Sequence, residues 1–167
     1  EGEQEEAINA LIDALRWDSR NGWALLLMGN IFARFKNDLT TALKYYDQAL
    51  VANVKDYISL TNIGYLLLQQ DKREEAKKYL WEALNINDQY PNAHFALGTI
   101  AEQEHDLQSA FFSFIQSIKL NNNKDALYQN AVKKAFDTAS RIIADGEGKK
   151  IYDEYLHKLE TEGDRQI

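Results

Sequence analysis

Two pairs of glutamate and histidine are the residues in this sequence whose types and spacing best suit metal chemistry. Glu102 and His105 are three positions apart, as are Glu154 and His157, and on a helix this spacing places each pair on one face. Helical bundles use such pairs to bind two metal ions, but they also need glutamates facing inward from other helices. The chain has 26 acidic residues, so acids beside histidines are expected from composition alone. We therefore expect a solvated surface here, with no metal site and no cofactor.

The segment from Asp145 to Lys150 resembles a phosphate-binding loop in composition only. One residue separates Gly146 from Gly148, where a phosphate loop has four between its glycines, and no strand is expected before them. We interpret the segment as a turn between helices. The H-E-x-x-H and G-x-S-x-G motifs are missing, and three histidines without a cysteine leave few candidates for nucleophilic catalysis. We therefore expect that the chain is not an enzyme.

The composition favours a helical domain that binds neither nucleic acid nor membrane. Proline occurs once, at Pro91, and its near absence favours long helices over a turn-rich β fold. The formal net charge is −7, and no cluster of Lys and Arg suggests the neutralisation of phosphates. No apolar stretch approaches the roughly 20 residues that span a bilayer. The absence of cysteine does not fix the compartment, and we expect a cytoplasmic location.

The chain contains an internal repeat, seen first in its glycines. Gly29, Gly64 and Gly98 are separated by 35 and 34 residues. Each glycine is followed by a triplet of a small, a bulky and a second small residue, and the spacing within the triplet is constant. The same triplet occurs once before the first glycine. In chain order the triplets are Ala7, Leu11 and Ala14; Ala42, Tyr46 and Ala49; Ala76, Leu80 and Ala83; and Ala110, Phe114 and Ser117.

Apolar periodicity predicts two antiparallel helices in each repeat, joined by a short polar turn. The expected ranges are 22–36 with 39–52, 56–70 with 73–86, and 90–104 with 107–120. Glycine inside a helix costs about 1 kcal/mol relative to alanine, so its recurrence predicts close helix packing, with Ala42, Ala76 and Ala110 as the opposite wall. Side chains that suit a helix-ending turn follow each unit: Asp18, Asn53, Asn87 and Asn121.

This unit resembles the tetratricopeptide repeat (TPR). The second and third units match the signature best, at Leu60, Ile63, Gly64, Leu67, Ala76, Leu80 and Ala83, and at His94, Leu97, Gly98, Ala101, Ala110, Phe114 and Ser117. His94 and Ala101 depart from the large residues expected, and the proline that usually closes each unit is missing. The resemblance covers residues 7–122. It implies an all-α, TPR-type α-solenoid of antiparallel helix pairs in a right-handed superhelix.

The resemblance divides the chain into repeats. Residues 1–20 would hold the second helix of a truncated TPR, and complete repeats would occupy 21–55, 56–89 and 90–123. Residues 124–167 would form a divergent repeat and a C-terminal capping helix. Within them we expect one long helix over 124–144 and a charged amphipathic helix from about 149 to 162. A lead-in to a further domain is the alternative for the last helix.

The resemblance also implies a function, which is the binding of a protein or peptide in a concave groove. In the family, the first helix of each repeat lines this groove, and an extended peptide lies along it. The corresponding partner-binding residues here are Leu26, Asn30, Arg34, Thr61, Asn62, Tyr65, Gln69, Phe95, Thr99, Gln103, Asn130 and Lys133, with Leu27, Ala96, Gln129 and Asp137 at neighbouring positions. Amides can bond a peptide backbone and aromatic rings can stack on its side chains. The partner's identity is unknown.

One subgroup of the family holds the C-terminal carboxylate of chaperones with Lys, Arg and Asn. Asn30 and Asn62 match the asparagine positions of that clamp, but Leu26, Asn92 and Ala96 occupy its basic positions. A carboxylate left with neutral donors loses its charge-assisted bonds. We therefore expect an uncharged or weakly basic extended segment as the ligand, and not a chaperone tail.

Three alternative functions come from other classes. An RNA-binding pentatricopeptide protein has a similar repeat, but it would be basic. The repeats could be the docking arm of a larger multidomain enzyme. A self-associating assembly module is also possible, because a truncated first repeat would expose the apolar side of the helix over 3–16 and allow a homo-oligomer to form through the terminal repeats.

Overall fold

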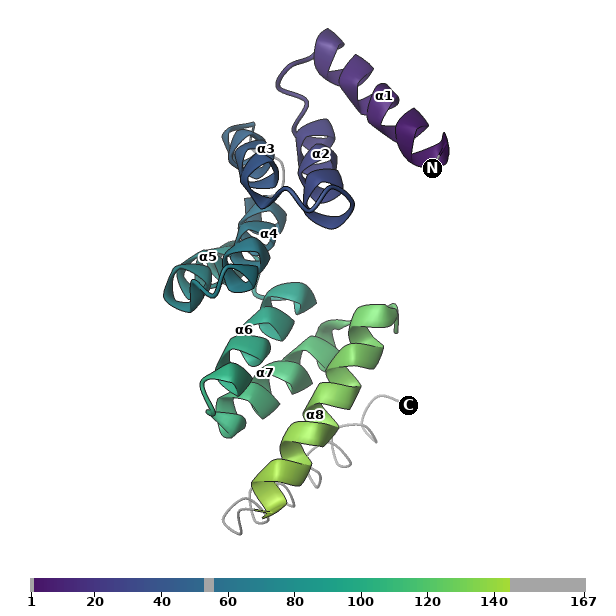
Figure 1. The fold of residues 1–167 in the computed structure, drawn as a ribbon. Coiled ribbons are helices and arrows are strands. Elements are labelled where there is room, and N and C mark those ends of the chain that lie inside the picture. The colour runs from purple at the N-terminus through teal and green to yellow at the C-terminus, as the bar shows by residue number, and fades with distance from the viewer. Residues whose placement is uncertain (1, 53–55, 145–167) are drawn as a thin grey trace. The chain divides into compact units, whose positions relative to one another are not determined.

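The computed structural model describes residues 2–52 and 56–144, with side chains described from residue 5 and, after the gap, from residue 57. These residues form eight α-helices and no strand (Figure 1). The helices are α1 (Gly2–Trp17), α2 (Gly22–Arg34), α3 (Leu39–Val51), α4 (Asp56–Gln69), α5 (Arg73–Ile86), α6 (Pro91–Gln103), α7 (Leu107–Leu120) and α8 (Ala126–Ala144). Each ends within two residues of its predicted range, so the all-α prediction is confirmed. The predicted turn over 145–150 and helix over 149–162 lie outside the described residues.

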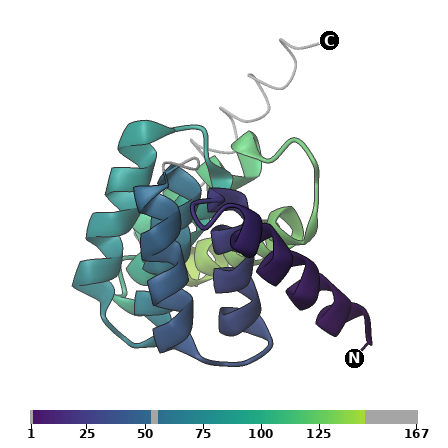
Figure 2. The same cartoon turned by 90° about the horizontal axis from the view of Figure 1, so that it is seen from above.

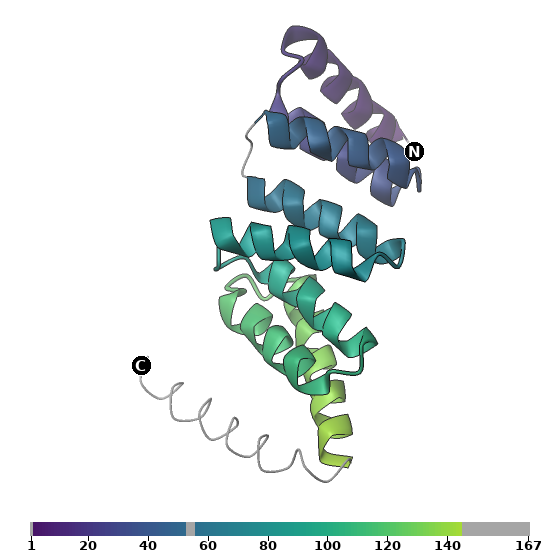
Figure 3. The same ribbon diagram turned by 90° about the vertical axis from the view of Figure 1, so that its left-hand side faces the viewer.

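The chain consists of two compact units, residues 1–96 and 97–167, and the division falls inside α6. In unit 1, α1 packs on α2, α2 on α3, α3 on α4, and α4 on α5. Figure 2 shows α1 beside α2, and Figure 3 shows α4 lying along α5. In unit 2, α7 packs against α8. Each unit is therefore a stack of neighbouring helices.

The repeated glycines let a bulky side chain of the second helix lie directly against the first. The three pairs are Gly29 with Tyr46, Gly64 with Leu80, and Gly98 with Phe114. A Cβ at Gly64 would lie 2.8 Å from both Cγ and Cδ2 of Leu80, which is closer than real Cβ contacts allow. All three bulky side chains are buried. The predicted reason for the glycines, close helix packing, is confirmed.

The opposite wall of this contact was assigned to the wrong residues. The space over each glycine is filled by the bulky residue four positions after the predicted alanine, because an alanine Cβ is too short to fill it. Among the three atoms nearest to the Cβ positions at Gly64 and Gly98, Ala76 and Ala110 contribute their carbonyl oxygens, at 3.5 and 3.2 Å. The alanines are nonetheless fully buried and bring the two backbones together.

Each repeat turns between its helices through a residue in the left-handed conformation. These residues and their φ angles are Asn37 (51°), Asp71 (59°) and His105 (64°). The second helix then begins at a capping side chain in two of the repeats. Asp38 accepts a hydrogen bond from the Thr41 backbone N–H at 3.0 Å, and Asp106 accepts one from the Ser109 N–H at 3.1 Å. The hydrogen bonds from these partners lower the pKa of both carboxyls.

Side chains that follow the second helices form the predicted turns. In each, the side-chain oxygen accepts a hydrogen bond from the backbone N–H two residues later. The distances are 3.0 Å from Arg20 N to Asp18, 3.1 Å from Gln89 N to Asn87, and 3.2 Å from Asn123 N to Asn121. The prediction is confirmed at these three positions, and the fourth, Asn53, lies outside the described residues.

Candidate partner-binding surface

Two of the predicted partner-binding side chains are buried. Leu26 is 3% exposed and Thr61 is 0% exposed, and the Thr61 hydroxyl donates to the Tyr57 carbonyl at 2.7 Å. A partner cannot contact them without unpacking the helices, so we omit both from the candidate surface. Ala96 is buried as well. The half-buried residues are Asn30, Asn62, Tyr65, Phe95 and Thr99, and the exposed ones are Leu27, Arg34, Gln69, Gln103, Gln129, Asn130, Lys133 and Asp137.

Hydrogen bonds join three helices of unit 1 at the side chain of Asn30. Its Oδ1 accepts from the Tyr46 hydroxyl at 2.8 Å and from Nδ2 of Asn62 at 3.2 Å. These bonds connect α2 to α3 and to α4, and they fix the orientation of both amides. Among the described residues, neither the Asn30 amide nitrogen nor the Asn62 amide oxygen has a partner. A donor and an acceptor therefore remain on a half-exposed surface.

Tyr65 lies one turn after Asn62 and extends this surface along α4. Its hydroxyl donates to the Asn92 carbonyl at 3.0 Å, in the first turn of α6 and within unit 1. Burial raises the pKa of Tyr65, and the nearby Tyr90 hydroxyl adds to the increase. Burial likewise raises the pKa of Tyr46 to about 12. Both phenols therefore stay protonated near neutral pH and keep their hydrogen-bond geometry.

Arg34 adds a positive charge beside these neutral groups. It follows Asn30 by four residues, so the two side chains lie on the same face of α2, about 5 to 6 Å apart at Cβ. The Arg34 guanidinium acts electrostatically on both phenols and opposes the rise in their pKa that burial causes. Within the described part of the chain it has no acidic partner. We call Asn30, Arg34, Tyr46, Asn62 and Tyr65 the polar wall.

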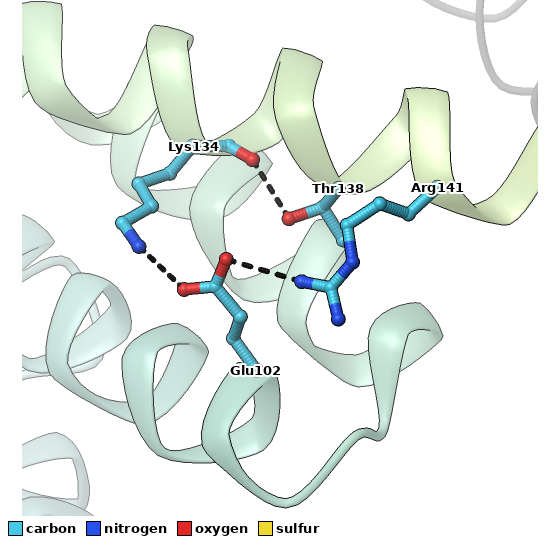
Figure 4. A network of polar contacts seen from close by, with 4 residues as sticks. All are labelled: Glu102, Lys134, Thr138 and Arg141. Atoms are coloured by element: carbon cyan, nitrogen blue, oxygen red, sulfur yellow. Dashed lines mark hydrogen bonds and ion pairs between the residues drawn. The ribbon is translucent and has the colours of Figure 1, made fainter.

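Unit 2 presents a different arrangement of charge. The Glu102 side chain of α6, 16% exposed, accepts from Lys134 Nζ at 2.6 Å and from Arg141 Nη1 at 3.5 Å (Figure 4). Both cations lie on α8, where the Thr138 hydroxyl donates to the Lys134 carbonyl at 2.7 Å. We call Glu102, Lys134 and Arg141 the charge cluster. Its carboxylate links α6 to α8 and satisfies both cations.

The charge cluster includes Glu102, one residue of the first glutamate–histidine pair considered as a metal site. Glu102 uses its two oxygens for Lys134 and Arg141, and His105 lies in the turn after α6. Across residues 5–52 and 57–144, no three side chains of His, Asp, Glu or Cys gather as metal ligands. The second predicted pair, Glu154 and His157, lies outside the described residues.

A comparison with protein families identifies the repeat. The tetratricopeptide-repeat model matches residues 57–90, which contain α5 and nearly all of α4. The chain therefore contains a TPR. Its all-α solenoid of helix pairs, with a glycine opposite a bulky residue in each complete repeat, is the TPR fold.

Solved TPR structures resemble this chain over most of its length. MamA is 18% identical, with a TM-score of 0.67, covering 98% of this chain and 92% of MamA. The TPR domain of Sgt2 from Aspergillus fumigatus is 20% identical, with a TM-score of 0.62, covering 72% and 78%. YrrB, described as a TPR protein with an unusual peptide-binding site, is 21% identical, with a TM-score of 0.61, covering 93% and 78%. At identities this low, the TM-scores show a shared fold alone. A search of curated proteins gave no match.

Two polar features of this TPR chain were missed in the sequence. Tyr46 lies on a second helix, and only first-helix positions had been assigned to the binding surface. A signal was present, because Tyr46 is the one polar residue among the three bulky positions that face a glycine. The charge cluster had a weaker signal, the separation of Lys134 and Arg141 by seven residues, or two helical turns.

No helix in the described residues is long and apolar enough to cross a membrane.

Proposed function

We propose that this TPR chain is a protein-interaction scaffold that binds an extended peptide segment along the polar wall of unit 1. The observation that carries the proposal is the hydrogen-bonded set of Asn30, Tyr46 and Asn62, which fixes two amides and leaves groups on them for a ligand. An extended peptide presents alternating backbone donors and acceptors, and side-chain amides can supply both. YrrB, which shares the fold, is described as having a peptide-binding site, and this supports the same class of ligand here.

Other predicted partner contacts lie on the first helix of the third repeat and on the last described helix. Phe95 belongs to unit 1, and its half-buried ring is a candidate stacking surface. Thr99, Gln103, Asn130 and Lys133 belong to unit 2, and they stay predicted partner contacts within that unit.

The proposal is tested with a library of short random peptides applied to the purified chain. We expect the wild type to retain a subset of peptides, and the Asn62→Ala/Tyr65→Ala double variant to lose them. Lys78→Met is the control, because Lys78 is an exposed residue of α5, a helix that contributes no residue to the polar wall. Thermal unfolding checks that the variants stay folded. Equal retention by the double variant and the wild type would exclude the polar wall as the binding site.

A second candidate function, self-association, is favoured by the exposure of one face of α1. Ala7 is exposed, and Leu11 and Ala14 are half-buried, whereas the corresponding residues of α3, α5 and α7 are all buried. In each complete repeat a glycine-bearing helix covers this face, and no described helix does so for α1. A cavity of about 470 Å³ lies beside α1 and α2, lined by Glu5, Ile8, Asn9, Met28, Ile31, Phe32 and Lys36.

Light scattering at two concentrations tests this second function. If the α1 face joins copies of the chain, the mass should rise with concentration, and Leu11→Glu should return it to the monomer value. Asn85→Glu is the control, since it adds the same charge to an exposed position of α5. A monomer mass at both concentrations would exclude self-association.

A further inference from the structure

The position of Arg34 specifies the chemistry of the ligand more narrowly than the amides do. We propose that the Arg34 guanidinium, together with the free amide nitrogen of Asn30, binds a carboxylate of the partner segment. This inference rests on the proposed function, because it names the ligand of the same polar wall. The carboxylate belongs either to an Asp or Glu side chain or to the C-terminus of the segment.

The first support is that, within the part of the chain that the structure describes, no carboxylate forms an ion pair with Arg34. Arg16, Arg73 and Arg141 each pair with a carboxylate in this chain, at 3.0, 2.6 and 3.5 Å. Among the described residues Arg34 pairs with none, although it lies beside a fixed hydrogen-bonded set. The described groups whose pKa it affects are the phenols of Tyr46 and Tyr65, which stay neutral. The guanidinium therefore keeps its full capacity for a carboxylate.

The second support is the complementarity of the donors. A guanidinium offers parallel N–H groups that match the two oxygens of a carboxylate, and such charge-assisted bonds are about twice as strong as neutral ones. The Asn30 amide nitrogen lies one turn earlier on α2 and has no partner among the described residues. Because Asn30 Oδ1 already accepts two hydrogen bonds, the amide is oriented with its nitrogen as the remaining group. The site thus offers donors to an anion.

The net charge of the chain does not oppose this. The formal charge of −7 repels an acidic ligand at long range, but at physiological salt the Debye length is only about 8 Å. At contact distance the adjacent guanidinium dominates. The positive charge of Arg34 also lies at a different position from the basic residues of a chaperone-tail clamp. Those clamp positions are occupied here by Leu26, Asn92 and Ala96. A carboxylate ligand is therefore compatible with the loss of that clamp, and it replaces the uncharged or weakly basic segment expected from the sequence.

The test uses a synthetic library of short random peptides in four matched forms. One internal position is Asp or its neutral isostere Asn, and each set is made with a free C-terminal acid or a C-terminal amide. Each form is applied to the wild type, Arg34→Met, Asn62→Ala/Tyr65→Ala and Lys78→Met, and the retained peptides are measured by mass spectrometry.

We expect the wild type to retain carboxylate forms about tenfold more than their neutral counterparts. A preference for Asp over Asn in the amidated peptides assigns the carboxylate to a side chain, and a preference for the free acid in the Asn peptides assigns it to the C-terminus. Arg34→Met should remove the preference while neutral peptides still bind, and Lys78→Met should keep it. The preference should also weaken as salt is raised, since the contact is charged.

Two outcomes separate this inference from the proposed function. If peptides bind through Asn62 and Tyr65 but show no carboxylate preference, or keep it in Arg34→Met, the inference is overturned and the proposed function stands. If no peptide binds, or the double variant loses nothing, the proposed function fails and the inference fails with it. Unfolding curves of Arg34→Met show whether the exposed substitution left the fold intact.

Discussion

The polar wall of unit 1 and the charge cluster of unit 2 use cations in opposite ways. In unit 2, Lys134 and Arg141 both reach Glu102, so their charges join one helix to another. In unit 1, Arg34 has no acidic partner among the described residues, and its neighbours are neutral amides and phenols. An internal carboxylate turns a cation into a structural contact, whereas its absence leaves the cation for a ligand. In unit 2 the two cations thus stabilise a contact between helices, whereas in unit 1 the cation is available to a ligand.

The same difference appears at the bulky position of each repeat. Tyr46, Leu80 and Phe114 all cover a glycine, but only Tyr46 carries a hydroxyl that reaches the first helix and bonds Asn30. One polar atom at a packing position therefore connects the core of unit 1 to its candidate binding surface. Leu80 and Phe114 fill their positions by packing alone. The predictions below separate packing effects, shared by both units, from polar effects, which differ between them.

The largest expected effect comes from placing a methyl group on a glycine in either unit. Gly98→Ala would bring Cβ to 2.8 Å from the Phe114 ring and 3.2 Å from the Ala110 carbonyl oxygen, and Gly29→Ala would overlap the buried Tyr46 ring. Each should lower the free energy of unfolding by about 1 to 3 kcal/mol through overpacking. Chemical denaturation measures this. Gly29→Ala should also reduce peptide retention, because it displaces the hydroxyl that orients Asn30.

The sign of the change in the free energy of unfolding is itself a control for both variants. At an uncrowded helix position, replacing glycine with alanine stabilises a protein by about 1 kcal/mol. A rise in stability for both variants would contradict the packing of Tyr46 and Phe114 against the glycines.

The next effect tests the charge cluster directly. Glu102→Gln removes the carboxylate that faces Lys134 and Arg141, and we expect a loss of about 1 to 2 kcal/mol, between the values for exposed and buried ion pairs. Hydrogen exchange should show the loss as weaker protection of α8. Arg34→Met is the matched variant in unit 1, and it should change stability by less than about 0.5 kcal/mol. Equal losses in the two variants would remove the distinction between the units.

A smaller effect is expected at a second small position of the repeat. Ser117 is fully buried, and its hydroxyl has no hydrogen-bond partner among the described residues, whereas Ala49 and Ala83 occupy the corresponding positions. Ser117→Ala should stabilise unit 2 by about 1 kcal/mol, because it removes an unsatisfied buried polar group. Ala83→Ser is the reverse change in unit 1 and should destabilise it by a similar amount. Denaturation curves that show Ser117→Ala to be destabilising would mean that the hydroxyl has a partner.

Much of the fold could be predicted from the sequence because it repeats. The spacing of Gly29, Gly64 and Gly98 identified the repeat. Apolar periodicity within each unit predicted the helix pairs, and Asp and Asn at the unit ends predicted the turns, since both are local signals. The residues that meet across a helix pair were predicted less well. Alanines were placed opposite the glycines, because spacing along one helix does not show which side chain is long enough to reach the next.

The candidate site was less predictable still, since its properties depend on contacts between helices. Leu26 and Thr61 occupy surface positions by their place in the repeat, but both are buried by neighbouring helices. Whether a cation has an acidic partner depends on residues distant in the sequence. Glu102 pairs with Lys134 from a separation of 32 residues, and no local motif distinguishes that pair from Arg34, which has no acidic partner among the described residues.

The smallest expected effect concerns the left-handed residue of each turn. His105 has a φ of 64° and Asn37 a φ of 51°, and a side chain in this conformation costs about 1 to 2 kcal/mol, less for asparagine, which adopts it more readily. Replacement with glycine relieves the strain but adds chain entropy to the unfolded state. His105→Gly should therefore stabilise unit 2 by about 0.5 kcal/mol, and Asn37→Gly should change unit 1 by less than that. Thermal and chemical unfolding measure both. A larger gain at Asn37 than at His105 would show that side-chain contacts, and not backbone strain, decide the stability of these turns.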